Sequence, residues 1–440
     1  MDFLISVLVF LFSLIFCLSR NISVLAALAI GTVSFSITAL HRGYGIKSVV
    51  LMLLRGVKKS FTLIPIFALI GIITGIWRAS GTISFFVYYG TLIMNPNYFI
   101  LFAFLISCTV SFALGTSFGT VGTIGVVLIV LARGGGVNIN AAAGAIISGA
   151  FFGDRCSPTS SSANLVATVT GTDLYGNVKR MMITGAVPFA ATVIFYIYLS
   201  KNNPISIADR TLLNEIEAHF NLSYVTVLPA LIIFALALLR KNVKISMSFS
   251  IAAAFFICLL IQKMKLKDVL YTMIFGFQMQ SDNMLSGIIS GGGLLSMFSV
   301  SLIIMTASSF SGIFEETGML NEIQEILKKM SYKAGLYLTT TFTSLVMSAF
   351  CCNQTLPILL THQLMNKLYK EKGLTDEDLA IDLENTTVMT PELFPWSIAI
   401  AVPLATLSAA PTSILYAVYL YLVPLINIVR LPALNKKTAL

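Results

Sequence analysis

The sequence predicts an all-α integral membrane protein with roughly ten to twelve membrane-embedded helices. Apolar residues make up 57% of the chain and charged residues only 11%, whereas about a quarter of a soluble domain is charged. Apolar runs close to the length of a helical span recur along the chain, as at residues 3–19, 22–40 and 61–77. These runs are continuous, whereas the strands of a membrane barrel alternate polar and apolar residues.

The later apolar runs are shorter or are interrupted by glycine and proline. A segment that cannot cross about 30 Å of hydrocarbon must pack inside the protein, so we expect broken or re-entrant helices among the spans. The runs lie at residues 99–114, 116–131, 141–152, 182–199, 225–239, 251–261, 300–314, 337–350 and 398–426.

The net charge of +9 comes from lysine and arginine clusters beside apolar runs, which indicates topogenic charge and no nucleic-acid partner. The strongest cluster comprises Arg42, Lys47, Arg55, Lys58 and Lys59. It predicts a cytoplasmic loop and, two spans earlier, a cytoplasmic N-terminus. The first apolar run lacks a basic start and a small-residue cleavage site, so we expect a retained helix and no signal peptide.

A long polar stretch divides the chain into two halves. Residues 201–221 predict a surface linker between a first half at 1–200 and a second half at 222–440. Two fused halves whose broken helices meet near the bilayer midplane are a recurring plan of secondary transporters, often with inverted orientation. Lys263, Lys265 and Lys267 carry the same sign as the matching loop of the first half, so the loop charges alone do not distinguish inverted from parallel halves.

Landmarks recur in the same order in both halves. Ser80-Gly81-Thr82-Ile83 matches Thr317-Gly318-Met319-Leu320, Thr116 matches Asn353, and Ser157-Pro158 matches Thr390-Pro391. We therefore predict two structurally similar, inverted repeats, each with a broken-helix segment.

The richest polar segment within the apolar sequence is residues 153–164. Pro158 prevents regular helix, which leaves backbone carbonyls near Asp154 free to bind another group. The serine and threonine hydroxyls, the Asn164 amide and the Asp154 carboxylate would form a cage of oxygen atoms, the ligand type that hard cations such as Na⁺ prefer. An embedded Asp154 could bind Na⁺ when ionised and release it when protonated. The alternative is a solvated Asp154–Arg155 pair.

A second polar segment, residues 115–125, interleaves glycine with hydroxyl residues. The pattern is typical of close helix packing, and exposed backbone beside Thr116 and Ser117 could also complete a cation shell. The matching Asn353 and Gln354 would add oxygens from the second half.

Glu392 and Glu384 are further candidate proton carriers beside Asp154. Glu392 lies between Pro391 and Pro395, which again predicts a broken helix. We assign the acids between Lys367 and Asp382 to a solvated loop. The sequence thus predicts a Na⁺ site at Asp154, Ser157 and Asn164, within a wider set of binding residues: Thr116, Ser117, Asp154, Ser157, Thr159, Ser160, Asn164, Asn353, Gln354, Thr390 and Ser397.

Four blocks of the sequence together resemble the NhaC-type sodium/proton antiporter family. They are residues 77–83 with Tyr88-Tyr89-Gly90 and Asn95-Pro96, residues 115–125, residues 144–164 with Gly171-Thr172-Asp173-Leu174, and residues 383–396. The resemblance runs from about Gly71 to Trp396. It implies a multi-pass cell-membrane antiporter, working by alternating access, that exchanges Na⁺ for protons at Asp154, Ser157 and Asn164.

The chain departs from this family pattern where an acid is expected, at Ser161 and at Asn385. Fewer acids favour the alternative, a Na⁺- or H⁺-coupled antiporter or symporter of an amino acid or small organic acid. No nucleophile elbow, HExxH or phosphate loop occurs, so we do not expect an enzyme. We expect no resident cofactor, since Na⁺ and H⁺ would be cargo. The expected partners are the lipid bilayer and a small solute, and a homodimer is compatible with the sequence.

Overall fold

The computed structural model describes the whole chain except residues 1, 21, 62–63, 94–95, 205–209, 240, 242, 280–285, 287–288, 318–334, 352 and 439–440. Helices account for most of the described residues, and no strand occurs among them. An isolated β-bridge joins Phe277 and Gly291. The predicted all-α fold is therefore confirmed. Two sequence landmarks, Asn95 and residues 318–320, lie outside the described residues.

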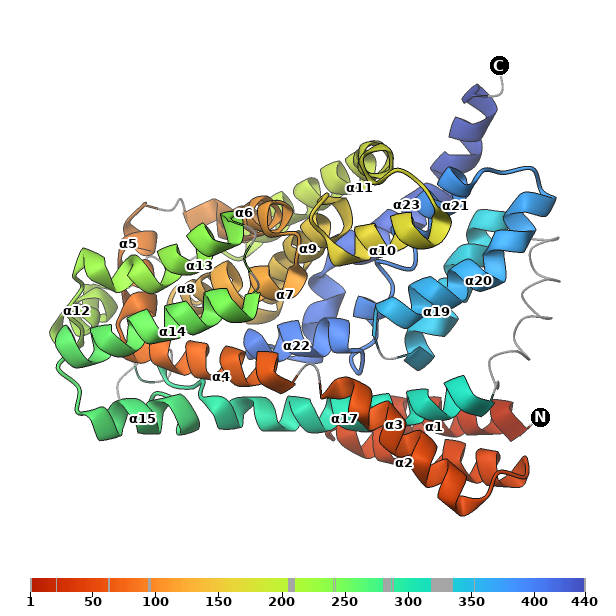
Figure 1. The fold of residues 1–440 in the computed structure, drawn as a ribbon. Helices are drawn as coiled ribbons and strands as arrows, with labels where there is room; N and C mark the ends of the chain where they lie inside the picture. Colours follow the sequence, from red (N-terminus) through yellow and green to blue (C-terminus); the bar gives the residue numbers. More distant parts are fainter. Residues whose placement is uncertain are drawn as a thin grey trace.

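The helices are named in chain order, as in Figure 1. They are α1 (Asp2–Ser19), α2 (Val24–His41), α3 (Ile46–Ser60), α4 (Ile64–Ala79), α5 (Thr82–Ile93), α6 (Phe99–Leu114), α7 (Ser117–Thr120), α8 (Val126–Gly134), α9 (Ile139–Cys156), α10 (Ser161–Thr170), α11 (Leu174–Asn202), α12 (Arg210–His219), α13 (Leu228–Leu238), α14 (Val243–Leu260), α15 (Leu266–Phe275), α17 (Phe298–Thr317), α19 (Leu336–Cys351), α20 (Thr355–Glu371), α21 (Asp376–Asn385), α22 (Ile398–Thr406) and α23 (Val418–Thr438). A π-helical turn, η2 (Val121–Gly125), joins α7 to α8, and 3₁₀ turns include η5 (Pro391–Leu393).

Many of these helices are apolar, and several are short or broken. Among the described residues, three helical segments are long and apolar enough to cross a membrane: Val24–His41, Leu174–Asn202 and Leu294–Phe314. A bent pair, Ile64–Ala79 with Thr82–Gly90, forms a further broken span with a bend of 64°, and seven shorter apolar helices accompany it. This mixture agrees with the predicted set of spans and broken segments.

Helices of both halves pack against one another. In Figure 1, α1, α2, α3 and α17 lie together along one side of the molecule, and α17 of the second half packs on α2 and α3 of the first. Glycines allow this close contact, because a Cβ built on Gly56 would lie 2.2 Å from the Ser308 carbonyl oxygen and one on Gly312 would lie 2.2 Å from that of Met52. We call α3 and α17 the α3–α17 layer.

Two polar stretches are more ordered than the sequence suggested. The expected linker at residues 201–221 contains α12, whose Ile216 is fully buried. The expected solvated loop between Lys367 and Asp382 is mostly helix, because α20 continues to Glu371 and α21 begins at Asp376. A capping box between Thr375 and Asp378 starts α21. The apolar side chains that follow it in the helix are buried in the protein.

Helix breaks occur at the landmarks that the sequence singled out in each half. In the first half, α6 ends before Gly115 and α9 ends before Ser157. In the second half, α19 ends at Cys351 and α20 begins at Thr355, while α21 ends at Asn385 and α22 begins only at Ile398. Breaks at these landmarks therefore occur in both halves, as predicted.

Candidate ion-binding site

The two breaks of the first half cross in direct backbone contact. Gly115 has a positive φ of 66°, and a Cβ placed there would lie 2.2 Å from Thr159 Oγ1 and 2.8 Å from the Ser160 nitrogen. Only glycine satisfies both the conformation and the contact. Farther along the same helix pair, a Cβ on Gly153 of α9 would lie 2.1 Å from the Ser111 carbonyl carbon. Small residues therefore bring the tips of α7 and α10 together.

Asp154, in the last turn of α9, lies at this crossing and is only 5% exposed. Its Oδ1 accepts from Ser160 Oγ at 3.4 Å, and its Oδ2 accepts from Ser117 Oγ at 3.5 Å. The amide Nε2 of Gln354 also lies 3.5 Å from Oδ2. These three distances exceed the usual 2.5–3.2 Å range, so polar groups surround the carboxylate without holding it tightly.

A cavity of about 440 Å³, which we call the Asp154 cavity, opens beside this carboxylate. It lies between the helix tips and the α3–α17 layer, which contributes Ser60 and Ser308. Other oxygen-bearing side chains at its wall are Thr116, Ser117, Ser161, Asn353, Gln354 and Thr355.

Gln354 connects the two halves of the molecule. Beside Asp154, its Nε2 lies 3.0 Å from the Val388 carbonyl oxygen and 3.2 Å from Glu392 Oε1. Glu392 is fully buried, and its Oε2 has no hydrogen-bond partner within the described part of the chain. The second half therefore brings one amide and one further carboxyl group to the first-half carboxylate.

Three predicted first-half residues turn away from Asp154. The hydroxyl of Ser157 donates to the Phe112 carbonyl of α6 at 2.7 Å and lies 2.7 Å from Thr159 Oγ1. Ser157 therefore holds the break against α6, and Thr159 bonds to Ser157. Asn164 is exposed, and its amide donates to the Ser160 and Pro158 carbonyls at 2.6 and 3.2 Å. Neither Ser157 nor Asn164 therefore contacts the Asp154 carboxylate. Ser157 is held by its bond to α6, and the rotation of α10 points Asn164 outward.

The remaining predicted residues of the second half mainly shape its breaks. Asn353 accepts from the Leu356 backbone nitrogen at 2.9 Å, Thr390 lies 2.8 Å from Ser348 Oγ, and Ser397 caps α22. Asn353 also lines the Asp154 cavity, whereas Thr390 and Ser397 are not among its wall residues.

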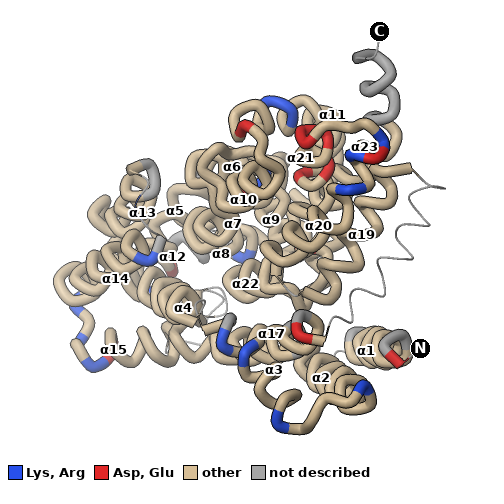
Figure 2. The backbone as a smooth tube through the Cα atoms, turned by 45° about the vertical axis from the view of Figure 1, so that its right-hand side comes forward, with Lys and Arg blue, Asp and Glu red and all other residues tan. Residues whose placement is uncertain are grey.

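Three further charged residues, on α9 and α21, are buried outside the wall of the Asp154 cavity. Many charged residues lie at helix ends and connections (Figure 2), but Arg155, Asp382 and Glu384 are buried, as Asp154 and Glu392 are. Arg155 donates to the Glu384 carbonyl oxygen at 3.2 Å, and Asp382 Oδ2 accepts from Tyr369 at 2.6 Å.

Sequence reasoning missed several residues of these clusters. Asp382 was hidden in a charged run, although the capping box and the following apolar residues are a usable signal for a buried helix face. Ser60 and Ser308 carried no signal, because only the packing of α3 and α17 brings them to the cavity.

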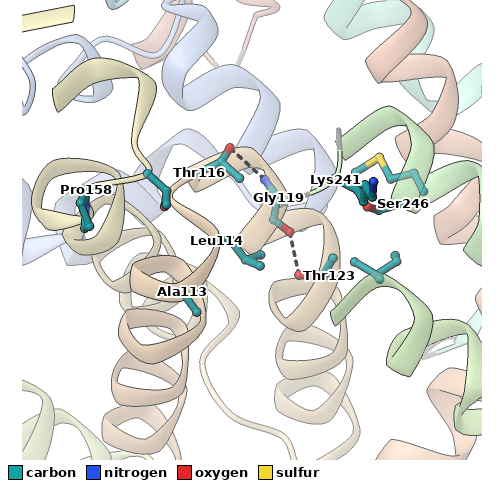
Figure 3. A pocket seen from close by; sticks show the side chains of 11 residues that line it. Ala113, Leu114, Thr116, Gly119, Thr123, Pro158, Lys241 and Ser246 are labelled. Atoms are coloured by element: carbon teal, nitrogen blue, oxygen red, sulfur yellow. Dashed lines mark hydrogen bonds between the residues drawn. The ribbon is translucent and has the colours of Figure 1, made fainter. Parts of the chain in front are cut away.

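A second cavity, of about 350 Å³, lies across the α6–α7 break, and we call it the Lys241 cavity. Thr116 lines both cavities. In Figure 3, Thr116 accepts from the Gly119 nitrogen and Thr123 donates to the Gly119 carbonyl, at 3.4 and 2.7 Å, while Lys241 and Ser246 lie on the facing wall. The break is thus the partition between two cavities.

The donor set around Asp154 fits a hard cation. It consists of one carboxylate with hydroxyl and amide groups, the oxygen ligands that such ions prefer. Within the described ranges, no group of three or more His, Cys, Asp or Glu residues is placed to hold a metal ion. The chemistry available here is reversible cation binding at a single carboxylate, in competition with a proton.

Comparison with known proteins places this site in a family context. The sequence model of the Na⁺/H⁺ antiporter family matches residues 3–163 and 149–431. An uncharacterized Na⁺/H⁺ antiporter of Haemophilus influenzae is 30% identical over 373 residues, which cover 82% of this chain and 79% of the relative. The Na⁺/H⁺ antiporter NhaC of Alkalihalophilus pseudofirmus is 29% identical over 382 residues, 86% and 83% of the two chains. The malate-2H⁺/Na⁺-lactate antiporter of Bacillus subtilis is 27% identical over 363 residues, 81% and 77%.

Proposed function

The chain belongs to the Na⁺/H⁺ antiporter family, which confirms the resemblance seen in the sequence, and we propose that Asp154 is where it exchanges Na⁺ for H⁺. One observation carries this assignment. Asp154 is a buried carboxylate with three long polar contacts, beside a cavity, where broken helices of both halves meet. Intramembrane carboxylates are energetically costly and usually mark ion pathways.

The ionised carboxylate would bind Na⁺ together with the hydroxyls of Ser117 and Ser160. A hydroxyl donates to the carboxylate in one state and offers a lone pair to a cation in another, so both serines suit a site that fills and empties. Gln354 would turn its amide oxygen toward the ion, because its side chain carries both a donor and an acceptor. A proton on Asp154 removes the negative charge that holds Na⁺, and this competition is the basis of exchange.

Alternating access would use the two cavities on either side of Thr116. Broken helices are the elements that move in transporters with paired repeats, since their ends are not held by a continuous hydrogen-bond ladder. We propose that the Asp154 cavity and the Lys241 cavity open to opposite sides in turn. Transport of this kind requires no catalysed chemical step, so we assign no enzymatic activity.

The protein is an integral membrane protein, and we propose the cell membrane as its location with the N-terminus in the cytoplasm. The basic residues Lys47, Arg55 and Lys58 lie exposed on α3, where positive charge favours the cytoplasmic side. Arg55 pairs with Glu316 of α17 at 2.9 Å.

Proton flux in vesicles that contain the purified protein tests this function. We expect Na⁺ pulses, with no organic solute present, to drive proton movement through the wild type and not through Asp154→Asn, because the amide cannot alternate between charge states. Asp268→Asn removes an exposed acid in the first turn of α15 and is the matched control, with flux equal to the wild type. Equal flux through Asp154→Asn and the wild type would exclude Asp154 as the exchange site.

A second candidate function is coupled transport of a small organic acid. The Asp154 cavity, at about 440 Å³, exceeds the space that a bare ion requires, and one relative is named for malate and lactate exchange. If Na⁺ alone drives no proton flux in the wild type, uptake of labelled amino acids and hydroxy acids with and without Na⁺ would test this alternative.

A further inference from the structure

Glu384, in the last turn of α21, is a buried carboxyl group that the Asp154 exchange does not use. Its exposed fraction is zero, and neither carboxyl oxygen has a hydrogen-bond partner within the described residues. The neighbouring buried acids differ, because Asp382 accepts from Tyr369 and Glu392 accepts from Gln354. An ionised carboxylate buried without a partner is strongly unfavourable, so this arrangement suits a protonated Glu384.

A fully buried arginine lies within reach of this carboxyl group. The Nε of Arg155 donates to the backbone oxygen of Glu384 at 3.2 Å, while its other nitrogens donate to uncharged acceptors, among them Thr184 Oγ1 at 3.0 Å and Tyr419 at 3.2 Å. The guanidinium of Arg155 already bonds to the backbone oxygen of Glu384. A rotation of the Glu384 side chain would therefore bring its carboxylate to the guanidinium. Glu384 would therefore have two arrangements, one protonated and unpaired as in the structure, and one ionised and paired with Arg155.

The cation site adjoins this pair directly. Asp154 precedes Arg155 in the chain, and the charges of Asp154 and Glu384 interact. A negative Asp154 opposes ionisation of Glu384, and a cation bound at Asp154 removes that opposition. Arrival of a cation at Asp154 would thus favour release of a proton from Glu384, with Arg155 left to balance the new negative charge.

Few other charges bear on Glu384. The tyrosines and the cysteine around it are uncharged at neutral pH, and Arg180 pairs with Asp378 at the exposed end of α21. The charged and titratable groups that interact with Glu384 are Asp154, Arg155 and Cys156, all from α9. Tyr419 of α23 faces Arg155, and Tyr369 of α20 and Tyr337 of α19 face Asp382.

We propose that Glu384 is a second proton-binding site, separate from the cation site at Asp154 and coupled to it through Arg155. The inference rests on the proposed Na⁺/H⁺ exchange and deepens it. In each cycle the carboxyl group of Glu384 loses one proton to the open aqueous side when Na⁺ binds, and regains one when Na⁺ leaves. Glu384 thereby adds one proton to the number exchanged for each Na⁺.

The number of protons moved per Na⁺ tests this role, measured from the Na⁺ and pH gradients at which flux through the full-length protein in vesicles reverses at a series of fixed membrane potentials. We expect Glu384→Gln to lower that number by one while exchange continues. Glu377→Gln is the matched control on the same helix. Glu377 is exposed, and a backbone hydrogen bond, followed by one from Thr375, holds its pKa below the usual range, so we expect the ratio to equal that of the wild type.

Three results would overturn the proposal. An unchanged ratio in Glu384→Gln would mean that Glu384 carries no proton. A variant that is still stabilised by Na⁺ against thermal unfolding but transports nothing would mean that Glu384 serves the conformational change. A variant that Na⁺ no longer stabilises would place Glu384 in the cation site. Absence of Na⁺-driven flux in the wild type would instead refute the proposed function itself.

Discussion

The helix breaks of the two halves follow one plan but are closed by different means. In the first half, Gly115 lies against Thr159 at backbone contact distance, and the serines beside it face a carboxylate. In the second half, the break after α21 is longer and is held by hydroxyl pairs, such as Ser344 with Thr387 at 2.6 Å. Among the described residues, the second half's hydrogen bond to the Asp154 carboxylate comes from the flexible amide of Gln354, at the start of α20.

This difference suggests a division of labour between the halves. A tight backbone crossing fixes the position of Asp154, whereas an amide on a flexible side chain can follow a change of state. We therefore expect substitutions at the first-half crossing to have large effects, and those at the second-half contact to have graded effects. Three substitutions test this expectation, from the largest effect to the smallest.

Gly115→Ala should be the most damaging of the three. A left-handed conformation costs a non-glycine residue about 1–2 kcal/mol, and the added Cβ would also overlap the backbone of Thr159 and Ser160, typically a further cost of about 1–3 kcal/mol. We expect a lower thermal unfolding temperature in detergent and loss of Na⁺-driven flux.

Gly171→Ala isolates the conformational part of that effect. Gly171 also has a positive φ, 68°, but nothing lies within 4 Å of a Cβ built there. If both variants lose the same thermal stability, the crossing can accommodate a Cβ at Gly115, and the proposed division between the halves is wrong.

Gln354→Ala should weaken Na⁺ binding about tenfold, which corresponds to about 1.4 kcal/mol and to the loss of one hydrogen bond to a charged group. The substitution removes the contacts of Nε2 with Asp154, Val388 and Glu392, so the second half no longer orders the carboxylate. The Na⁺ concentration for half-maximal flux measures the change. Gln363→Ala, at an exposed position of α20, should leave that concentration unchanged.

Much of the fold was predictable from local chemistry. Pro158 removes a backbone donor within a polar segment, and Gly115 ends an apolar run in a polar patch, so the sequence located both breaks and placed Asp154 at one of them. The direction of each side chain around a break was not predictable, because it depends on the rotation of the helices that meet there. Ser157 and Ser160 have the same hydroxyl, yet one bonds to α6 and the other to Asp154.

Contacts between distant segments were also beyond sequence reasoning. Ser60 and Ser308 reach the cavity through the packing of α3 on α17, and no local pattern distinguishes them from other serines in apolar helices. Arg155 appeared in the sequence as a partner of Asp154, whereas the fold directs it to α21 and Glu384.

Asn164→Ala should have the smallest effect, although the sequence placed Asn164 in the cation site. The amide is exposed and bonds to the Ser160 and Pro158 carbonyls, and exposed substitutions usually change stability by no more than about 0.5 kcal/mol. We expect the half-maximal Na⁺ concentration to stay within about twofold of the wild type, because the amide bonds to backbone carbonyls and not to the Asp154 carboxylate, and twofold in affinity is only about 0.4 kcal/mol. A large loss of Na⁺ affinity at an unchanged unfolding temperature would show that Asn164 enters the site in another conformation. The first-half crossing would then rearrange during transport, and the second half would be the more rigid of the two.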